Sequence, residues 1–222
     1  MPRSRASSLV VLVFGLAMAA LLLLTGPLLL FFPPVVSFEQ SRHDVPGLLR
    51  TDQATVDRAT SSMLADLVRN GDFTVSIAPS GEPVLDAKER SHMRDVGGVV
   101  RGLILADAIA LALALVLGWR LRNERARRAR AMLAAAAGIG VAAVVLGGFF
   151  ALAFEAAFAA FHSIFFAAGS WTFGPDSNLL RFFPEPLWFE LALLAGATIV
   201  LSAALVGAWA WRTLARAPAE AD

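Results

Sequence analysis

The residues of this chain that are best suited to chemistry at neutral pH are its three histidines, His43, His92 and His162. A histidine can take up or release a proton between about pH 5 and 8, so two of them can act as general base and general acid in one reaction. The chain has no cysteine, which excludes a thiol nucleophile. It also lacks the short motifs of serine hydrolases, zinc proteases and P-loop proteins. The sequence therefore favours proton transfer by histidine.

Two of the histidines have carboxylates at helical spacing. Glu89 and Asp95 lie three residues before and after His92, and Glu155 lies seven residues before His162 on the same helical face. A carboxylate beside an imidazole can orient the ring and make it more basic. A histidine near a membrane surface is also a common polar anchor. A metal site would require all three histidines to converge, which no ligand spacing supports, so we predict no metal and no cofactor.

Long apolar stretches must position these residues. The chain is 57% hydrophobic; residues 9–32, 131–154 and 191–211 contain no charge, and residues 103–119 contain one acid. About 20 apolar residues cross a hydrocarbon core of roughly 30 Å. The first stretch is too long for the core of a signal peptide, so we expect it to be retained. The sequence therefore predicts an integral membrane protein with four transmembrane helices, at 9–36, 98–119, 131–156 and 190–211.

Arginines predict how these helices are oriented. The loop 120–130 holds six arginines in eleven residues, and further arginines lie at both ends of the chain, at Arg3, Arg5, Arg212 and Arg216. Basic residues concentrate on the cytoplasmic side of a membrane protein. We therefore expect this loop, the N-terminus and the tail 212–222 to be cytoplasmic. We interpret the arginine loop as a topology signal and expect no nucleic-acid partner.

The segment 37–97 then lies outside, and it is too long for a simple connector. Apolar residues at helical spacing predict a helix at about 52–70, and two β-type stretches around a short turn predict a hairpin at about 73–85. Asp86 and Glu89 form a capping box for a further helix at about 87–97. The predicted fold is mostly α: a four-helix membrane bundle with a small extracytoplasmic α/β cap.

The second outer segment, 157–189, contributes the other polar groups of the outer region. They are Trp171, Asp176, Asn178, Arg181 and Glu185. A tryptophan at this depth is also typical of the aromatic belt of membrane proteins. An aspartate in the stretch FGPDSN is also typical of a turn.

Two stretches give the sequence a family likeness: SHMRDV at 91–96, and FEAAFAAFHSIFF at 154–166 followed by tryptophan, aspartate and Pro-Glu. Their order and spacing resemble those of the lipoprotein intramolecular transacylase family, Lit, and the resemblance covers the whole chain. Members are four-helix bacterial membrane enzymes with an extracellular cap. They move the acyl chain from the sn-2 position of a lipoprotein's diacylglyceryl group to the α-amine of its N-terminal cysteine, which gives a lyso-form lipoprotein.

The resemblance implies that His92 and His162 are the catalytic pair, and we expect Asp95 and Glu155 to orient them. The chemistry agrees, because aminolysis within one molecule needs no nucleophile from the enzyme. An α-ammonium group has a pKa of about 8 and an imidazole of about 6.5, so a histidine can take the proton near neutral pH. Which histidine is the base and which the acid stays open.

The resemblance also implies the partners, a diacylated lipoprotein and membrane lipid. We expect Trp171, Asp176 and Arg181, with Glu185 as a further supporting residue, to shape the head-group pocket. The chain has Ala-Ala-Gly at 167–169, where family members have asparagine. A backbone N–H or Arg181 is therefore left to bind the oxyanion.

Two other classes of function are considered. A non-catalytic membrane module would bind an envelope partner through the cap and would leave the two imidazoles far apart. A metal-dependent membrane hydrolase would bind its metal through His92 and His162. The distance between the two imidazoles, together with whether a lipid-sized groove opens beside them, separates these alternatives from a catalytic pair; the metal-dependent hydrolase would also lose its activity to chelators.

Overall fold

The computed structural model describes residues 6–78 and 80–216 of the chain. Arg3, Arg5 and residues 217–222 of the expected cytoplasmic tail lie outside the described residues. The chain divides into two compact units. Unit 1 is formed by the described parts of Met1–Pro27, Leu105–Gly148 and Ala195–Asp222, and unit 2 by Leu28–Ile104 and Phe149–Leu194.

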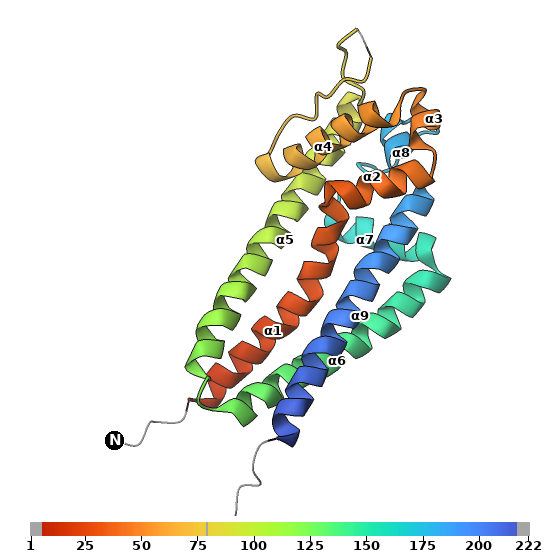
Figure 1. Cartoon of the computed structure of the whole chain (residues 1–222). Coiled ribbons are helices and arrows are strands. Elements are labelled where there is room, and N and C mark those ends of the chain that lie inside the picture. Colours follow the sequence, from red (N-terminus) through yellow and green to blue (C-terminus); the bar gives the residue numbers. More distant parts are fainter. Residues whose placement is uncertain (1–5, 79, 217–222) are drawn as a thin grey trace, which may run out of the picture. The chain divides into compact units, whose positions relative to one another are not determined.

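Four long apolar helices contribute to unit 1 (Figure 1). They are α1 (Ser8–Leu28), α5 (Ala87–Arg120), α6 (Arg125–Leu152) and α9 (Glu185–Ala215), and each is long and apolar enough to cross a membrane. Small residues let helices of this unit approach closely: a Cβ on Gly26 of α1 would lie 2.8 Å from a side-chain carbon of Ile199 on α9. Among the polar contacts, Thr25 donates to Asp107 at 3.2 Å.

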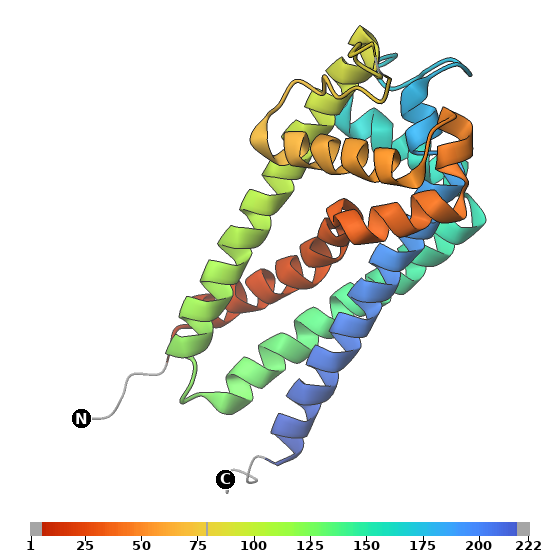
Figure 2. The same cartoon turned by 45° about the horizontal axis from the view of Figure 1, so that its top comes forward.

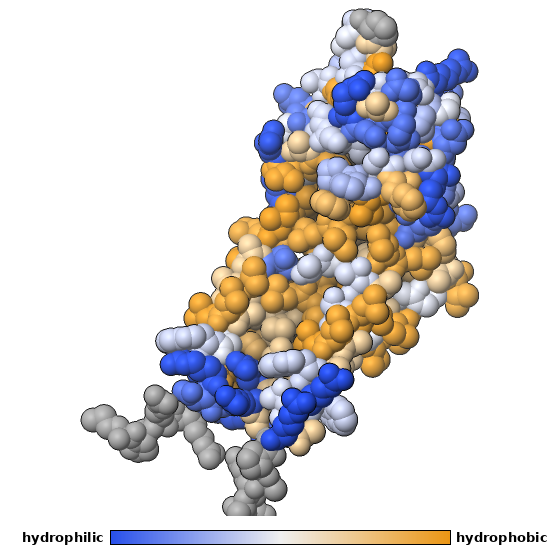
Figure 3. Space-filling view, viewed as in Figure 1, coloured by the Kyte–Doolittle hydropathy of each residue, from blue (hydrophilic) through white to orange (hydrophobic). Residues whose placement is uncertain are grey.

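The surface of unit 1 is apolar along the helices and hydrophilic at one end (Figure 3). Exposed hydrophobic side chains in this unit include Leu12, Leu16, Leu105, Leu115, Val141, Leu201 and Leu205. At the end where α5 and α6 join, Arg122 lies over the ring of Trp119, 4.0 Å from its centroid. Arg128 lies over Trp209 at 5.7 Å. An apolar surface bordered by aromatic and basic side chains is typical of a membrane-spanning unit.

Unit 2 contains the short helices, the N-terminal parts of α5 and α9 and the C-terminal end of α6. Its helices are η1 (Leu29–Phe31), α2 (Pro33–Arg42), α3 (Val45–Leu49), α4 (Gln53–Arg69), α7 (Phe154–Phe165) and α8 (Asn178–Phe182). The first apolar stretch does not continue as one helix because Phe32 is extended, and the prolines that follow it start α2. α2 and α4 lie side by side, as Figure 1 and Figure 2 both show.

The core of unit 2 joins the segments 37–97 and 157–189 of the sequence. α4 begins where Asp52 accepts a hydrogen bond from the Thr55 N–H, and its buried face repeats at helical spacing. The core includes Val36, Val56, Met63, Leu67, Phe73, Leu85, Phe182 and Leu187, each at most 2% exposed. One buried polar group bridges three helices, because Gln40 of α2 accepts from Thr60 of α4 and donates to the Phe182 carbonyl of α8, both at 3.0 Å.

The predicted α/β cap was wrong, because the described residues contain no β-strand and the cap is helical with an irregular loop at 71–86. Among the described residues of the expected hairpin, a single backbone hydrogen bond joins the two expected strands, from the Val84 N–H to the Val75 carbonyl at 2.9 Å, and another closes the turn, from the Gly81 N–H to the Ala78 carbonyl. Phe73 has a left-handed φ of 56° and is buried, and Leu85 is buried at the other end. The helical core thus fixes both ends of the loop, and a lone hairpin with no further strand beside it is marginal.

Candidate active site

Unit 2 brings His92 and His162 together, although seventy residues separate them in the sequence. Their ring centroids are 6.0 Å apart and the ring planes differ by 25°, so the two imidazoles are stacked. His92 lies in the second turn of α5 and is only 6% exposed. His162 lies in the last turn of α7 and is half-buried. The two rings are close enough to act on one substrate group.

α7 presents His162 with one defined tautomer. Ala153 has a non-helical backbone, with φ −141° and ψ 49°. It therefore separates α6 from α7 and is the N-cap residue of α7. Four residues before the histidine, the Phe158 carbonyl lies 2.8 Å from Nδ1 of His162. Because a carbonyl oxygen can only accept, Nδ1 carries the proton and Nε2 carries the lone pair. The neutral ring therefore presents its basic nitrogen away from α7's backbone.

Aromatic rings enclose the histidine pair. Phe166 is the C-cap residue of α7 and has an extended backbone. Its ring contacts both imidazoles, with its centroid 4.9 Å from that of His92 and 5.4 Å from that of His162. The ring centroid of Phe173 lies 5.5 Å from that of His92, and the ring centroid of Trp171 lies 4.9 Å from that of His162. Among these rings His92 is almost fully buried, whereas His162 is half-buried.

Burial sets the protonation of the site. It lowers the pKa of His162 from its ordinary value of 6.5, and the hydrogen bond with Phe158 opposes this only in part. His162 is therefore neutral near pH 7. Nδ1 of His92 is buried and has no hydrogen-bond partner among the described residues. A buried polar atom without a partner costs about 1–3 kcal/mol, so this nitrogen is a natural partner for a bound substrate group.

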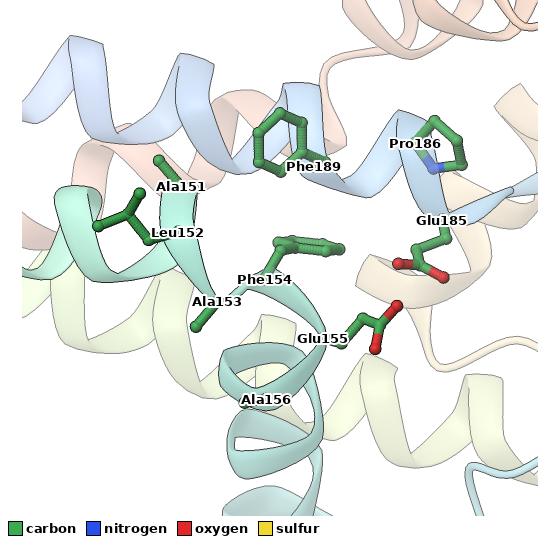
Figure 4. Close-up of a pocket in the computed structure, with 9 residues that line it drawn as sticks. All are labelled: Ala151, Leu152, Ala153, Phe154, Glu155, Ala156, Glu185, Pro186 and Phe189. Carbon is green, nitrogen blue, oxygen red and sulfur yellow. The ribbon is translucent and has the colours of Figure 1, made fainter.

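Neither expected carboxylate is hydrogen-bonded to an imidazole among the described residues, although the charge of Asp95 partly offsets the lowering of the His92 pKa by burial. Asp95 is exposed on α5, and within the described residues no hydrogen bond joins it to His92. Glu155 lines a cavity of about 550 Å³ together with Glu185, and Figure 4 shows the two carboxylates turned toward each other across it. The ring of His162 is oriented by the Phe158 carbonyl, where the sequence suggested Glu155.

Asp176 and Arg181 form a separate polar group. Oδ1 of Asp176 lies 3.6 Å from Nη2 of Arg181, and Arg181 also donates to Oδ1 of Asn178 at 3.1 Å. Arg181 lines a second cavity, of about 530 Å³, beside Arg50 and the loop 71–86. Of the residues expected around the histidines, Trp171 is therefore in direct contact with one of them, whereas Arg181 faces this other cavity.

His43 belongs to a different cluster. Its Nε2 lies 3.5 Å from Oε2 of Glu190, and potential ligand atoms of Glu39, His43 and Glu190 lie within 4.8 Å of one another. Arg42 pairs with both carboxylates and already supplies a positive charge there. The contacts of His43 thus differ from those of the histidine pair.

Sequence reasoning missed several residues that build the site. Phe166 stands in the family-like stretch 154–166 without a role of its own, and Phe173 has no assigned role either, because no spacing rule relates a loop residue to a distant helix. Lys88 was not singled out, yet its ammonium donates to the Thr172 carbonyl at 2.6 Å. Glu89 was recognised as a helix cap, but its long-range hydrogen bonds, described below, have no local signature.

Comparisons with known proteins identify a related group. The sequence model described as lipoprotein intramolecular transacylase Lit matches residues 10–188. Among solved structures, the membrane integral lipoprotein intramolecular transacylase Lit from Bacillus cereus has a TM-score of 0.82 and 18% identity, and the match covers 94% of this chain and 95% of that one. A search of the curated proteins found no match.

Two variants of the Bacillus cereus protein have also been solved, with one histidine replaced by arginine or by alanine. Each has a TM-score of 0.75 and 16% identity, and the matches cover 94% of this chain and 92% and 93% of those chains. At these identities the structures show a common fold. They support the all-helical, membrane-integral architecture in place of the α/β cap.

Proposed function

Since this chain belongs to the lipoprotein intramolecular transacylase family, Lit, and is an acyltransferase of the membrane, we propose that it transfers an sn-2 acyl chain within a diacylated lipoprotein. The acceptor is the α-amine of the N-terminal cysteine, and the product is a lyso-form lipoprotein. The observation that carries this proposal is the pair of enclosed imidazoles, 6.0 Å apart. A non-catalytic module would not need the two rings together.

The first step concerns the proton of the substrate's amine. The α-ammonium, with a pKa of about 8, must lose a proton before its nitrogen can attack. Buried His92, whose Nδ1 has no partner in the described structure, takes this proton from the bound substrate. Burial lowers the pKa of His92 to about 4, so this transfer is uphill and the charged ring is a strong acid that readily passes the proton on. The substrate itself thereby charges the histidine that later serves as general acid.

The next steps transfer the acyl group. The amine nitrogen bonds to the carbonyl carbon of the sn-2 ester, while Nε2 of His162, the nitrogen with the lone pair, takes a second proton from that nitrogen. The bond from the carbonyl carbon to the glycerol oxygen breaks, and the proton on His92 passes to this oxygen. An amide and a free glycerol hydroxyl result. His162 then releases its proton to water, which balances the reaction.

The surroundings suit a substrate that is half lipid and half peptide. Apolar rings beside the histidines accommodate the acyl chain, and no covalent enzyme intermediate is needed because the amine and the ester belong to one molecule. The basic loop at 120–130 supports placing the histidines and the cap on the extracytoplasmic side, with both termini cytoplasmic.

The test is acylation of the amine by the purified protein in lipid nanodiscs with a diacylated lipopeptide. Substrate and product have the same mass, because the acyl chain only moves, so fragmentation in the mass spectrometer must locate it on the amine. Wild type is expected to give the N-acylated fragment, and the double variant His92→Ala, His162→Ala is expected to give none. Wild-type protein that leaves the amine free under these conditions contradicts the proposed activity.

The pH dependence of the reaction follows from the lowered pKa of His162. A base works in its neutral form, and burial lowers the pKa of His162 below 6.5, so the midpoint of the fall in rate at low pH should lie below pH 6.5. Single-turnover rates measured between pH 4.5 and 8.5 locate this fall in rate. A midpoint at or above pH 6.5 would instead point to a base whose pKa is not lowered.

A further inference from the structure

Glu89 is a buried carboxylate with partners in two distant parts of unit 2. It is 2% exposed, and all its hydrogen bonds come from neutral groups. Oε2 accepts from the Asp86 N–H at 2.8 Å and so caps α5. Oε1 accepts from the Ser177 hydroxyl and from the Leu179 N–H, the latter at 2.9 Å. One side chain therefore connects the start of α5 with the start of α8.

The segment between α7 and α8, residues 167–177, is the loop that covers the histidines. It has no helix or strand of its own, and most of it is exposed. It nevertheless carries Trp171, in contact with His162, and Phe173, in contact with His92. Since the loop has little buried surface, its position depends on the few hydrogen bonds that hold it.

Two of these hydrogen-bonded anchors come from one turn of α5. Glu89 holds the end of the loop at Ser177. Lys88 holds its middle by donating to the Thr172 carbonyl, and its ammonium lies 5.3 Å from the centre of the Phe173 ring. His92 lies three residues beyond Glu89, one turn further along the same helix. The loop is thus fixed to the helix that carries one of the histidines.

We propose that Glu89 is a positioning residue of this enzyme, which holds the loop 167–177 so that Trp171 and Phe173 enclose the two imidazoles. The proposal rests on the proposed function, because the reaction that it assists is the acyl transfer. Burying a carboxylate is costly, and an ordinary helix cap at a protein surface works without it. The two long-range hydrogen bonds explain why this cap is buried.

The experiment compares Glu89→Gln with Glu82→Gln, an exposed glutamate in the loop 71–86 that serves as the matched control. Glutamine keeps the size of the side chain but places an N–H₂ group where one carboxylate oxygen accepts. We expect kcat to fall about 10–100-fold in Glu89→Gln, with KM within about twofold, because the chemical groups are present but misplaced. Glu82→Gln should match wild type in both constants.

A second readout reports the loop directly. A protonated imidazole quenches the fluorescence of an indole that it touches, so the emission of Trp171 should fall as His162 is protonated at low pH. The signal is the emission of each protein minus the emission of the same protein with Trp171→Phe. This subtraction cancels the emission of the other four tryptophans. In Glu89→Gln this pH-dependent step should lose at least half of its amplitude, and in Glu82→Gln it should be unchanged.

The outcomes separate the two proposals. If wild type shows the fluorescence step but makes no N-acyl product, the proposed function fails and the fluorescence comparison still decides the role of Glu89. A Glu89→Gln variant with wild-type kcat and a wild-type step overturns the role. If that variant cannot be purified folded, Ser177→Ala and Lys88→Met each remove one anchor and are expected to give smaller losses of the same two signals; wild-type values in both overturn it as well.

Discussion

Replacing His162 by alanine should lower the rate of N-acylation by about 10²–10⁴-fold, the range that a general base contributes. The ring owes its basic nitrogen to the hydrogen bond between Nδ1 and the Phe158 carbonyl, and alanine has no group that can replace it. Single-turnover formation of the N-acylated fragment measures the effect. His162→Gln should be equally slow, because glutamine can donate to the carbonyl but cannot take a proton at neutral pH.

The third histidine supplies the matched control. His43 contacts Glu190 in the cluster with Arg42, so His43→Gln should keep the wild-type rate while making the same chemical change. A His162→Gln variant with more than a tenth of the wild-type rate would exclude His162 as the base. Thermal unfolding of all three variants shows whether a slow rate reflects an unfolded protein.

Replacing His92 should have the second-largest effect, a loss of about 10²–10³-fold for His92→Ala on a glycerol ester. The proposed acid protonates the departing oxygen, and an alkoxide is a poor leaving group without that proton. The assignment predicts a substrate dependence that simple damage would not produce. The test substrate is a lipopeptide whose acyl chain is attached through a phenolic oxygen, which leaves readily because its conjugate acid has a pKa of about 10. At about pH 9, where the α-amine is already neutral and needs no proton acceptor in the first step, most of the loss should disappear on this ester.

His162→Ala is the control for this second measurement. A base is needed whichever oxygen departs, so His162→Ala should remain slow on the phenolic ester. Equal losses for His92→Ala on both esters would show that His92 does not protonate the leaving group. If instead His162→Ala is the variant rescued by the phenolic ester, the two roles are exchanged.

The sequence predicted the features that depend on local patterns. Uncharged stretches identify helices that can cross a membrane. The capping box is confirmed, since Asp86 and Glu89 exchange both hydrogen bonds at the start of α5. The family likeness is confirmed too, because it depended on motif order. The predicted topology places His92 and His162 on the same side of the membrane. The structure brings their ring centroids to 6.0 Å from each other.

What the sequence could not predict depends on contacts between distant segments. The stretch 73–85 has the composition of a hairpin, but Phe73 and Leu85 are drawn into a helical core that local patterns do not reveal. Glu155 shares a helical face with His162, yet the hydrogen-bond partner of the ring is the nearby Phe158 carbonyl. Most side-chain hydrogen bonds are made to the backbone or to water and not to other side chains. The approach of Phe173 to His92 depends on how an irregular loop is held, and no periodicity describes that.

The buried Gln40 has a consequence for how the protein is made. It joins α2 to the Phe182 carbonyl, 142 residues later, and the same core takes in Leu187 at the start of α9. The chain emerges from the ribosome from its N-terminus, so the cap helices are made long before the segment that completes their core. Until α8 has been made, Gln40 lacks one of its partners and the apolar faces of α2 and α4 remain incompletely covered. Assembly of the cap is therefore a late event in biogenesis, and the histidine pair forms only when the second outer segment has reached the first.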